Sequence, residues 1–581
     1  MPTPLTPLRQ AIAELLACAV CDLFPKTLLV ASKISAVGFH YDFVFAHPID
    51  TQALQLIEER MRFLVKQDLP IQSVDMMRAN AIDFFSHRQQ HLVADALATS
   101  SAQFVSLFKM GDFFDLSSLD AYATSSEIEG AFRLQNFHES TLILSEKDTL
   151  PLTRIEGTAF PDAYTLKKFL KRAEAAKKKD HLVLGEQMKL YSTHQDLGGG
   201  THFWHPKGSL LRKFLLDLWQ SEIEKQNTQF LVTPPFIPTD FLKEKQYRRS
   251  DKNRTSYLPA MTVGETTCAL RSSLTPHHAT VFQSQKPTQQ ELPLRYAECS
   301  LLFEQEEQDS LCGLFQSRIY EADREHLFCT PEQFFEELIS SLHFIDKIIK
   351  MFGFEHHWIL VHRNQGRVPY FERWKECVKE MERALTSCSI DYQKDESATQ
   401  PYGPSLHVCI SDALGREWKG PYITVDLFHA ERLKLSYRGV DGQQHEPILM
   451  VRSIYGSIER FIALLVEHYG GEFPFWLSPE QIRVIPLSMK NTSYAEEIQQ
   501  KIKELGFRSQ IDYRLDNLAE KVHIAEREKV PYIIIVGENE ERDRTITTRS
   551  GHKGTVQNKV KLDTFLEGLS SNQLDNWTAP K

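Results

Sequence analysis

The spacing of hydrophobic and polar positions changes several times along the chain. Up to about residue 150, short helical and strand-like runs are mixed. From Asp162 to Leu190 the charges are dense, which predicts one long polar helix, a solvent-exposed arm. Residues 209–226 predict a strongly amphipathic helix, and residues 229–237 a β-like run. From there to about residue 477, the pattern predicts helices that alternate with short strands.

Glycine and proline mark the breaks in this pattern. Gly157 with Pro161 predicts a turn, Gly198–Gly200 a flexible linker, and Pro474–Pro479 a boundary. Beyond that boundary the pattern reads strand, helix, strand, which predicts a small α/β domain with a largely parallel sheet. The whole is predicted to be an α+β multidomain protein. Its segments are 1–150, a connecting strand and helical arm at 151–200, a core at 201–477, the α/β domain at 478–570, and a frayed tail at 571–581.

Composition narrows the class of protein. The 581 residues are 42% hydrophobic and 25% charged, as in soluble globular proteins. No apolar run reaches about 18 residues, so we expect no membrane helix. The N-terminus lacks a basic region followed by a cleavage site, so we expect a cytoplasmic protein. Cys18 and Cys21 form a lone C-x-x-C in an apolar helical stretch, which favours two buried thiols over a redox or metal pair.

Charge restricts the partners. The net charge of −10 argues against indiscriminate binding of nucleic acid, and nothing indicates DNA. One local stretch, residues 243–254, carries six basic residues, two acidic ones and a tyrosine. It is interpreted as a solvated loop or as a contact for RNA phosphates.

Five segments in order resemble one family. They are FWHPKGSLLRKF with LVTPPFI, LPLRYAE at 292–298, GSIERF at 456–461, EAAKKKDHLVLGEQMKLY, and FPFWLSPEQIRVIPL. The chain resembles bacterial-type threonyl-tRNA synthetases, class II enzymes, from residue 10 to residue 565. The resemblance implies a class II core with an antiparallel sheet, an N-terminal editing-like α+β domain and a C-terminal α/β anticodon-binding domain. The small ubiquitin-like domain that often starts these enzymes has no counterpart in the sequence.

The resemblance also assigns positions for ATP chemistry. The arginine that motif 2 presents to the α-phosphate falls on Glu304, and the adenine-reading glutamate falls on Glu306. A carboxylate has the wrong sign at the first position, since two unit charges roughly 4 Å apart interact by about 4 kcal/mol at an effective dielectric of about 20. Glu304 is alternatively a solvated residue of an acidic loop. Arg318 and Arg324 are the nearest cations that could replace the missing arginine.

The segment that resembles motif 3 retains more of the family's residues than the segment that resembles motif 2. Arg460, Ser457 and Arg452 stand at the family's positions, so ATP with Mg²⁺ stays a candidate cofactor. Arg460 is alternatively a helix residue paired with Glu459 or Glu467.

The family's zinc and threonine pocket is changed. The resemblance places the three zinc ligands at Thr275, His326 and Val451, of which only His326 binds metals, so we expect no zinc. His277 and His278 are alternative ligands beside Thr275. Four further pocket positions depart from the family: an aspartate is replaced by Arg324, two glutamines by Ala322 and Thr424, and a lysine by Ser405.

The two outer domains carry further assigned positions. The family's editing histidines and cysteine fall on Gln10, Glu14, Ser117 and Ala121, none of which offers an imidazole or a thiolate. In the anticodon-binding domain, Lys521 and Arg549 are candidates for tRNA contact.

Three hypotheses follow. The first is a pseudo-synthetase that keeps the fold and binds tRNA, a nucleotide or a protein partner. The second is an active threonine–tRNA ligase with a rebuilt, zinc-free site, and the third is a structural dimer partner of an intact synthetase. A homodimer through the helix of residues 209–226 is expected, with its apolar face in the contact: Leu210, Leu211, Phe214, Leu215 and Leu218.

Overall fold

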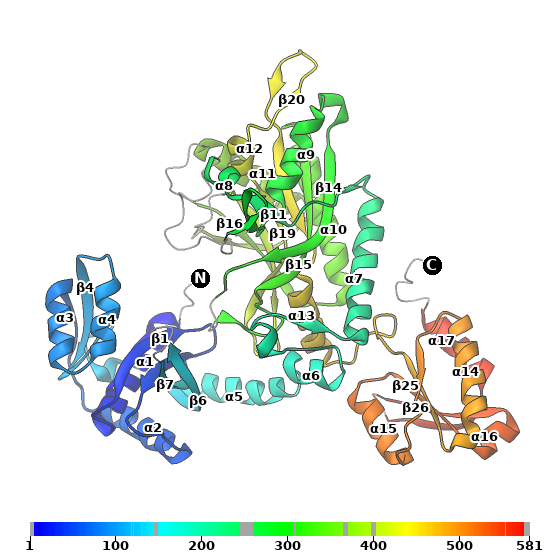
Figure 1. The fold of residues 1–581 in the computed structure, drawn as a ribbon, viewed down its shortest axis with the longest axis horizontal. Coiled ribbons are helices and arrows are strands. Elements are labelled where there is room, and N and C mark those ends of the chain that lie inside the picture. Colours follow the sequence, from blue (N-terminus) through cyan, green and yellow to red (C-terminus); the bar gives the residue numbers. More distant parts are fainter. Residues whose placement is uncertain are drawn as a thin grey trace. The chain divides into compact units, whose positions relative to one another are not determined.

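The computed structural model describes residues 5–117, 119, 121–128, 130–143, 149–244, 260–306, 310–363, 370–396, 402–551 and 554–573. The chain divides into two compact units (Figure 1). Unit 1 is Met1–Ala175 with Leu414–Arg416, and unit 2 is Ala176–Ala413 with Glu417–Lys581. Each unit is described by itself.

Unit 1 is an α+β structure with two antiparallel sheets. The first has the order β1-β2-β7-β6, and the second β3-β4-β5. Helix α1 supplies much of the core, since Leu15 and Leu16 are fully buried. The bounds are β1 (Leu28–Ile34), β2 (Phe39–Val44), β3 (Ile71–Met77), β4 (Phe104–Met110), β5 (Phe113–Asp115), β6 (Ala131–Ile143), β7 (Thr149–Phe160), α1 (Thr6–Leu23), α2 (Thr51–Lys66), α3 (Arg78–His87) and α4 (His91–Thr99).

The turn predicted around Gly157 is wrong, because strand β7 runs through it. Gly157 pairs with Phe39 of β2 on one side and with Leu134 of β6 on the other. A Cβ atom at Gly157 would lie 2.6 Å from Cζ of Phe39. The glycine therefore serves close packing of a ring against the strand, and not a change of chain direction.

The single long helix predicted for residues 162–190 is also wrong. The structure has α5 (Ala163–Lys177) and α6 (His181–Gln187) instead. Asp180 caps α6, because its carboxylate accepts a hydrogen bond from the backbone N–H of Leu182 at 2.8 Å. The dense charge correctly predicted a helical segment, but it did not indicate the break between Lys177 and His181.

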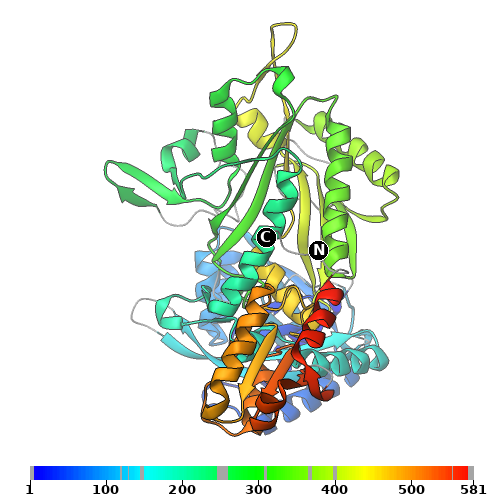
Figure 2. The same ribbon diagram turned by 90° about the vertical axis from the view of Figure 1, so that its right-hand side faces the viewer.

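Unit 2 is built on an eight-stranded sheet of order β10-β14-β15-β22-β19-β18-β16-β17. Its pairings are antiparallel except β10–β14 and β16–β17, as expected of a class II core. The strands are β10 (Gln229–Phe230), β14 (Leu294–Phe303), β15 (Ile319–Cys329), β16 (His356–Val361), β17 (Tyr392–Asp395), β18 (Ser405–Ser411), β19 (Glu417–Val425) and β22 (Ile448–Ser453). The larger helices around it are α7 (Pro206–Glu224), α10 (Phe334–Phe352), α11 (Phe371–Ser387) and α13 (Ile458–Tyr469) (Figure 2).

Smaller elements complete this core. Two short sheets, β11-β13-β12 and β20-β21, and the pair β8–β9 lie outside the main sheet. Their bounds, with those of the short helices, are β8 (Tyr191–Ser192), β9 (Phe203–Trp204), β11 (Phe236–Pro238), β12 (Met261–Val263), β13 (Thr266–Leu270), β20 (Tyr437–Arg438), β21 (Gln444–His445), α8 (Thr239–Glu244), α9 (Thr275–Gln285) and α12 (Leu427–Arg432).

Helix α7 turns its apolar face into the chain's own core. Leu211, Leu215 and Leu218 are fully buried, and Phe214 is almost so. They share one cluster with residues of α10 and α13, and Leu210 packs against it. Leu211, Phe214, Leu215 and Leu218 are therefore used in intramolecular packing and are not available to a dimer contact, whereas Leu210 is only partly buried. The expected homodimer itself stays a prediction.

The C-terminal part of unit 2 has a five-stranded sheet, β24-β23-β25-β26-β27. It is mixed, since β23 pairs in parallel with β24 and β25, whereas β26 pairs antiparallel with β25 and β27. The largely parallel sheet that was predicted holds only for its first half. The elements are β23 (Ile482–Pro486), β24 (Ser509–Ile511), β25 (Tyr532–Val536), β26 (Thr545–Ser550), β27 (Val556–Lys561), α14 (Thr492–Glu504), α15 (Leu518–Arg527), α16 (Glu538–Asp543) and α17 (Leu562–Gln573).

Three further sequence features are located by the structure. Among the described helices, none is both long and apolar enough to cross a membrane. Cys18 and Cys21 are free thiols on α1, and burial raises the pKa of the Cys21 thiol to about 12, as buried protonated thiols require. The basic stretch of residues 243–254 lies outside the described residues from Lys245 onward.

Candidate functional site

A cavity of about 210 Å³ opens in unit 2 beside strands β14, β15, β18 and β19 and the start of α13. The ten-residue antiparallel pairing of β14 with β15 fixes which side chains reach it. Its lining is rich in charge and aromatic rings: Glu304, Glu306, Phe315, Gln316, Ser317, Tyr320, Arg324, His407, Lys419, Gly420, Tyr422, Gly456, Ser457 and Arg460. Four positions named from the sequence, Glu304, Glu306, Ser457 and Arg460, thus share one cavity with Arg324.

Glu304 follows directly after β14 and is held in the cavity wall. Its backbone N–H donates to the carbonyl of Arg318 at 2.9 Å, and its carboxylate accepts from the Tyr320 hydroxyl at 2.7 Å. Burial raises the pKa of Tyr320, so the phenol stays protonated and donates. Glu304 is therefore an ordered part of the cavity, and the alternative of a solvated loop residue does not describe it.

Glu306 lies in the following loop and is tied to its neighbours. Its carboxylate accepts from the hydroxyl of Ser310 and the side-chain amide of Gln316, at 2.8 and 2.9 Å. Arg318 donates to the carbonyls of Glu306 and Gly199, at 3.0 and 2.7 Å. Arg318 is not in the cavity lining; its hydrogen bonds hold the backbone of the loop that carries Glu306.

Arg460 lies on the first turn of α13, where Ser457 is the N-cap. The Ser457 hydroxyl accepts from the Arg460 backbone N–H at 3.2 Å. The guanidinium donates through Nε to the carbonyl of Phe315 at 2.9 Å and lies over the Trp418 ring. Burial lowers the pKa of Arg460. The ion pairs with Glu459 or Glu467 that were the alternative do not form among the described contacts, and the guanidinium belongs to the cavity.

Arg452 has a different place from the other motif 3 residues. It is 0% exposed and forms a buried ion pair with Glu325, its Nη2 lying 2.6 Å from Oε2. It also donates to the side chains of Ser341 and Gln226. Arg452 is absent from the cavity lining, so the structure assigns it to joining β22 and β15 rather than to a nucleotide.

The three positions assigned to zinc ligands do come together. His326 is opposite Val451 in the β15–β22 pairing, and its Nε2 lies 3.0 Å from the Thr275 hydroxyl. Burial, then His278, lowers the pKa of His326 well below its usual value. One imidazole nitrogen, one hydroxyl and one aliphatic side chain do not fit zinc, which takes sulfur, nitrogen or carboxylate ligands.

The neighbouring histidines are engaged elsewhere. Nε2 of His278 lies 3.2 Å from a carboxylate oxygen of Glu298, and Nε2 of His277 lies 3.2 Å from the carbonyl of Phe236. The rings of His278 and His326 meet edge to face at 4.5 Å. The substitute-ligand alternative therefore lacks a third metal-binding side chain here among the described residues.

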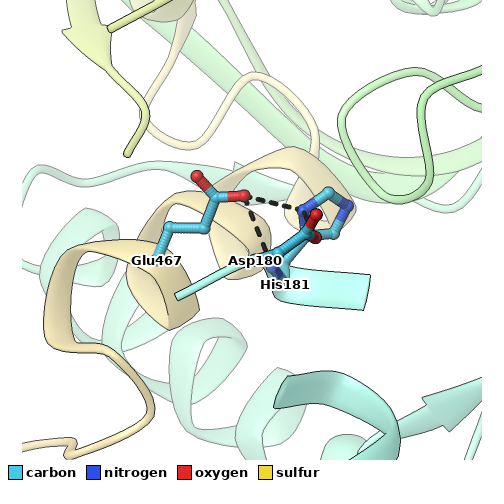
Figure 3. Close-up of side chains that lie close together, drawn as sticks. All are labelled: Asp180, His181 and Glu467. Atoms are coloured by element: carbon cyan, nitrogen blue, oxygen red, sulfur yellow. Dashed lines mark hydrogen bonds and ion pairs between the residues drawn. The ribbon is translucent and has the colours of Figure 1, made fainter. Parts of the chain in front are cut away.

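One cluster with metal-ligand chemistry does exist in the described part of the chain: Asp180, His181 and Glu467 (Figure 3). Nδ1 of His181 lies 2.9 Å from Oε1 of Glu467, and its Nε2 accepts from the Leu314 backbone N–H at 3.3 Å. The other Glu467 oxygen accepts from the Ala413 N–H at 2.9 Å. Both ring nitrogens of His181 are thus hydrogen-bonded, so the cluster links α6 to α13 and does not offer a cation site.

In unit 1, three of the four editing positions meet. The Gln10 side-chain amide donates to the Ser117 hydroxyl at 2.9 Å. Glu14 is buried, and burial, then the charge of Asp115, raises its pKa well above the usual value. Ala121 is exposed. The arrangement offers an amide, a hydroxyl and a carboxyl group of raised pKa, and these three side chains include neither the thiolate nor the imidazole base that hydrolysis of the family kind uses.

The two candidate tRNA contacts lie on the predicted elements. Lys521 on α15 is buried, and its ammonium donates to the carbonyls of Pro486 and Asp512 at 3.4 and 3.3 Å. Arg549 on β26 is half-exposed and pairs with Glu526 at 2.6 Å. Arg549 can therefore reach a ligand by exchanging its partner, whereas Lys521 is committed to main-chain oxygens.

Comparisons with known proteins fit this geometry. Residues 262–469 match the family model "tRNA synthetase class II core domain (G, H, P, S and T)", and residues 481–572 match "Anticodon binding domain". The fold and the site define a protein of the class II aminoacyl-tRNA synthetase type. The chain is 30% identical over 574 residues to the threonine–tRNA ligase of Nitrosococcus oceani, covering 97% of this chain and 87% of that protein. It is 32% identical over 562 residues to that of Acetivibrio thermocellus, with the same coverage of both chains. The chain belongs to the threonine–tRNA ligase family.

A solved structure supports the same fold. The crystal structure of the RNA binding domain of threonyl-tRNA synthetase from Cryptosporidium parvum matches with a TM-score of 0.62 and 29% identity. The match covers 69% of this chain and 99% of that chain. The resemblance seen in five sequence segments is thereby confirmed at the level of family and fold.

Proposed function

We propose that this member of the family binds tRNA and does not activate threonine by the family's reaction. The observation that carries the proposal is Glu304, whose ordered carboxylate stands in the cavity wall where the resemblance places the motif 2 arginine. Activation gathers negative charge on the α-phosphate, and a fixed cation there is worth about 10²–10³ in rate. A carboxylate at that position repels the same charge, by about 4 kcal/mol at roughly 4 Å and an effective dielectric of about 20.

The threonine pocket supports the same proposal. A single histidine among Thr275, His326 and Val451 does not hold the metal that orients the substrate's amino and hydroxyl groups. Arg324 stands where the resemblance places an aspartate, so the pocket's charge is inverted as well as its ligand set. The proposal also holds that the chain does not hydrolyse mischarged tRNA, because Gln10, Glu14 and Ser117 supply no imidazole or thiolate.

Binding of tRNA is proposed from the C-terminal domain. That domain matches the anticodon-binding model, and the relatives are named threonine–tRNA ligases. Arg549 is half-exposed, but Lys521 donates to backbone carbonyls. We therefore expect tRNA binding to be weaker than it would be if both cations were free to contact RNA. Arg460 and Ser457 line the cavity, so binding of a nucleotide with Mg²⁺ there is part of the proposal.

One observation favours a second function, an active ligase with a rebuilt site. Arg324 lines the same cavity as Glu304 and presents a guanidinium there. If that cation replaced the motif 2 arginine, threonine and ATP would still react. The two functions differ in whether ATP is consumed.

The test is threonine-dependent ATP–pyrophosphate exchange on the purified chain, with metal content measured on the same sample and tRNA binding measured by filter retention. We expect no exchange, no bound zinc and retention of tRNA. Exchange that disappears in Arg324→Gln but persists in Arg383→Gln, a surface arginine on α11, would establish the rebuilt enzyme instead. Absence of tRNA retention would overturn the binding half of the proposal.

A further inference from the structure

A second cavity, of about 360 Å³, opens in the C-terminal part of unit 2. It shares no lining residue with the cavity of Glu304 and Arg460. Its volume falls in the range of about 300–1,000 Å³ that is usual for small-molecule sites. The lining comes from the segment after α13, the start of β25, the β26–β27 hairpin and helix α17: Phe473, Phe475, Pro531, Tyr532, Thr548, Ser550, Thr555, Gln557 and Phe565.

Aromatic rings form the apolar walls of this cavity. The ring of Tyr532 meets those of Phe475 and Phe565 edge to face, with centroids 5.7 and 5.5 Å apart. All three residues are only partly buried, so part of each ring stays accessible. Aromatic rings attract a further ring by offset stacking or by edge-to-face contact. The walls therefore suit a planar aromatic group.

The β26–β27 hairpin adds hydrogen-bonding groups. Thr548 lines the cavity and is 4% exposed, and its hydroxyl has no hydrogen-bond partner among the described residues. Buried polar groups are nearly always hydrogen-bonded, so an unpartnered hydroxyl in a cavity wall indicates a place for a polar atom of a ligand. Gln557, opposite Thr548 in the strand pairing, and Thr555 are exposed and offer both donors and acceptors.

Charge restricts what this cavity can hold. Among the described residues, no charged side chain lines it. A charge that is taken out of water without a partner of opposite sign is costly. The cavity therefore favours a neutral ligand over one that carries a phosphate or a carboxylate.

The cavity and Arg549 lie on opposite faces of the sheet. Side chains alternate along a strand, so Ile546 and Thr548 of β26 share one face and Arg549 lies on the other. Ile546 belongs to the core that α14 and α17 cover, whereas Arg549 pairs with Glu526 of α15. The cavity is thus separate from the candidate tRNA contact.

We infer that this cavity binds a nucleoside, with its base against the aromatic walls and a polar atom on the Thr548 hydroxyl. A nucleobase is planar and uncharged and carries donors and acceptors along its edge, and the ribose brings hydroxyl groups for Thr555 and Gln557. A nucleotide adds a charge that the lining does not balance. The inference goes beyond the proposed function and does not depend on tRNA binding.

The test is calorimetric titration of the full chain with adenosine and with uridine, each compared with its 5′-monophosphate. We expect at least one nucleoside to bind, and its monophosphate to bind about tenfold more weakly. Thr548→Val keeps the shape of the side chain, removes the hydroxyl and should weaken nucleoside binding about fivefold. Because this hydroxyl has no partner in the described protein, the substitution should not lower stability toward urea, as loss of a structural hydrogen bond would.

Thr547→Val is the matched control. Thr547 is the neighbouring residue, lies on the opposite face of β26, and its hydroxyl donates to Glu540 at 3.0 Å. This variant should bind the nucleoside as the parent protein does. Phe565→Leu on α17 serves as a second variant if Thr548→Val does not fold, and it should weaken binding about tenfold because base stacking is lost.

Three results would overturn the inference: no binding of either nucleoside, a monophosphate that binds more tightly than its nucleoside, or nucleoside binding that neither Thr548→Val nor Phe565→Leu weakens. Filter retention of tRNA is read on the same variants and should be unchanged, because the cavity lies on the face away from Arg549. Failure of the tRNA proposal and failure of this one are therefore separate results.

Discussion

Burial sets the protonation of the carboxyl groups in unit 1. Glu14 is 1% exposed, and Asp115 beside it is 5% exposed. The pKa of each is raised, by burial in the first place, and for Glu14 next by the charge of Asp115. The Tyr41 hydroxyl donates to Asp115 at 2.5 Å, which favours the charged form of that residue. The pair thus holds a proton at pH values where free carboxyl groups have lost theirs.

This raised pKa makes the stability of unit 1 depend on pH. The folded state binds the proton more tightly than the unfolded state, so stability is fully present below the ordinary carboxyl range and falls as pH rises above about 4.5. Glu14→Gln carries no titrating group and should remove most of this slope. The measurement is amide hydrogen exchange of α1 as a function of pH, corrected for the intrinsic rate.

Tryptophan fluorescence provides the control. All seven tryptophans lie beyond residue 200, so this signal reports unit 2 and should be the same in both proteins. An unchanged slope in α1 after the substitution would mean that Glu14 is not the proton-holding group.

At the scale of elements, close approach decides where strands run. Gly157 in β7 lets the Phe39 ring of β2 lie against the strand, and Phe39 is itself 3% exposed. A glycine that reads as a turn in the sequence is in fact a packing position of the sheet.

We expect Gly157→Ala to destabilise unit 1 by about 1–3 kcal/mol, the usual cost of overpacking a core. The added methyl group would lie 2.6 Å from Cζ of Phe39 and 3.1 Å from Cδ2 of Leu134. Gly568→Ala on α17 is the matched control, because a Cβ there meets nothing within 4 Å. Amide hydrogen exchange of β2 and β7 measured over a series of urea concentrations gives the change in unit 1, and a stability equal to that of the parent protein would contradict it.

At the scale of the whole molecule, a buried charge network inside unit 2 joins the start of α7 to the C-terminal domain. Lys207 lies 2.7 Å from carboxylate oxygens of both Glu480 and Glu528. Arg483 bonds to the same two glutamates. Burial alone would raise the pKa of Glu528, but the charge and hydrogen bonds of Lys207, Lys189 and Arg483 lower it to about 2.

We expect Glu528→Gln to destabilise unit 2 by about 3 kcal/mol, since removing one partner leaves buried charge uncompensated. A lowered folded pKa stabilises the fold above the ordinary carboxyl pKa, and this stabilisation is lost as pH falls through about 2. The variant should therefore lose less stability on acidification than the parent protein. Urea unfolding followed by tryptophan fluorescence at neutral and acidic pH measures both effects.

The control lies two residues away. Glu526 pairs with Arg549 at a half-exposed position, and Glu526→Gln should cost about 0–1 kcal/mol. Equal effects of the two substitutions would show that the network does not couple the domains.

The sequence by itself determined the family and the positions of the site. Five ordered segments placed Thr275, His326 and Val451 together, and the structure brings them together. The same register placed Glu304, Glu306 and Arg460, which share one cavity. Register carries over because strand pairing fixes which residues are opposite one another, whatever side chains they bear.

Only the tertiary structure decided which charges are paired and which are open. Arg452 and Arg324 look alike in the sequence, yet the first is joined to the carboxylate of Glu325, whereas the second donates to carbonyl and hydroxyl oxygens and lines the cavity. Lys521 is buried against carbonyls, and the leucines of α7 face the chain's own core. The physical reason is that periodicity is local, whereas a buried side chain meets partners more than a hundred residues away, and those partners fix its charge, its pKa and its role.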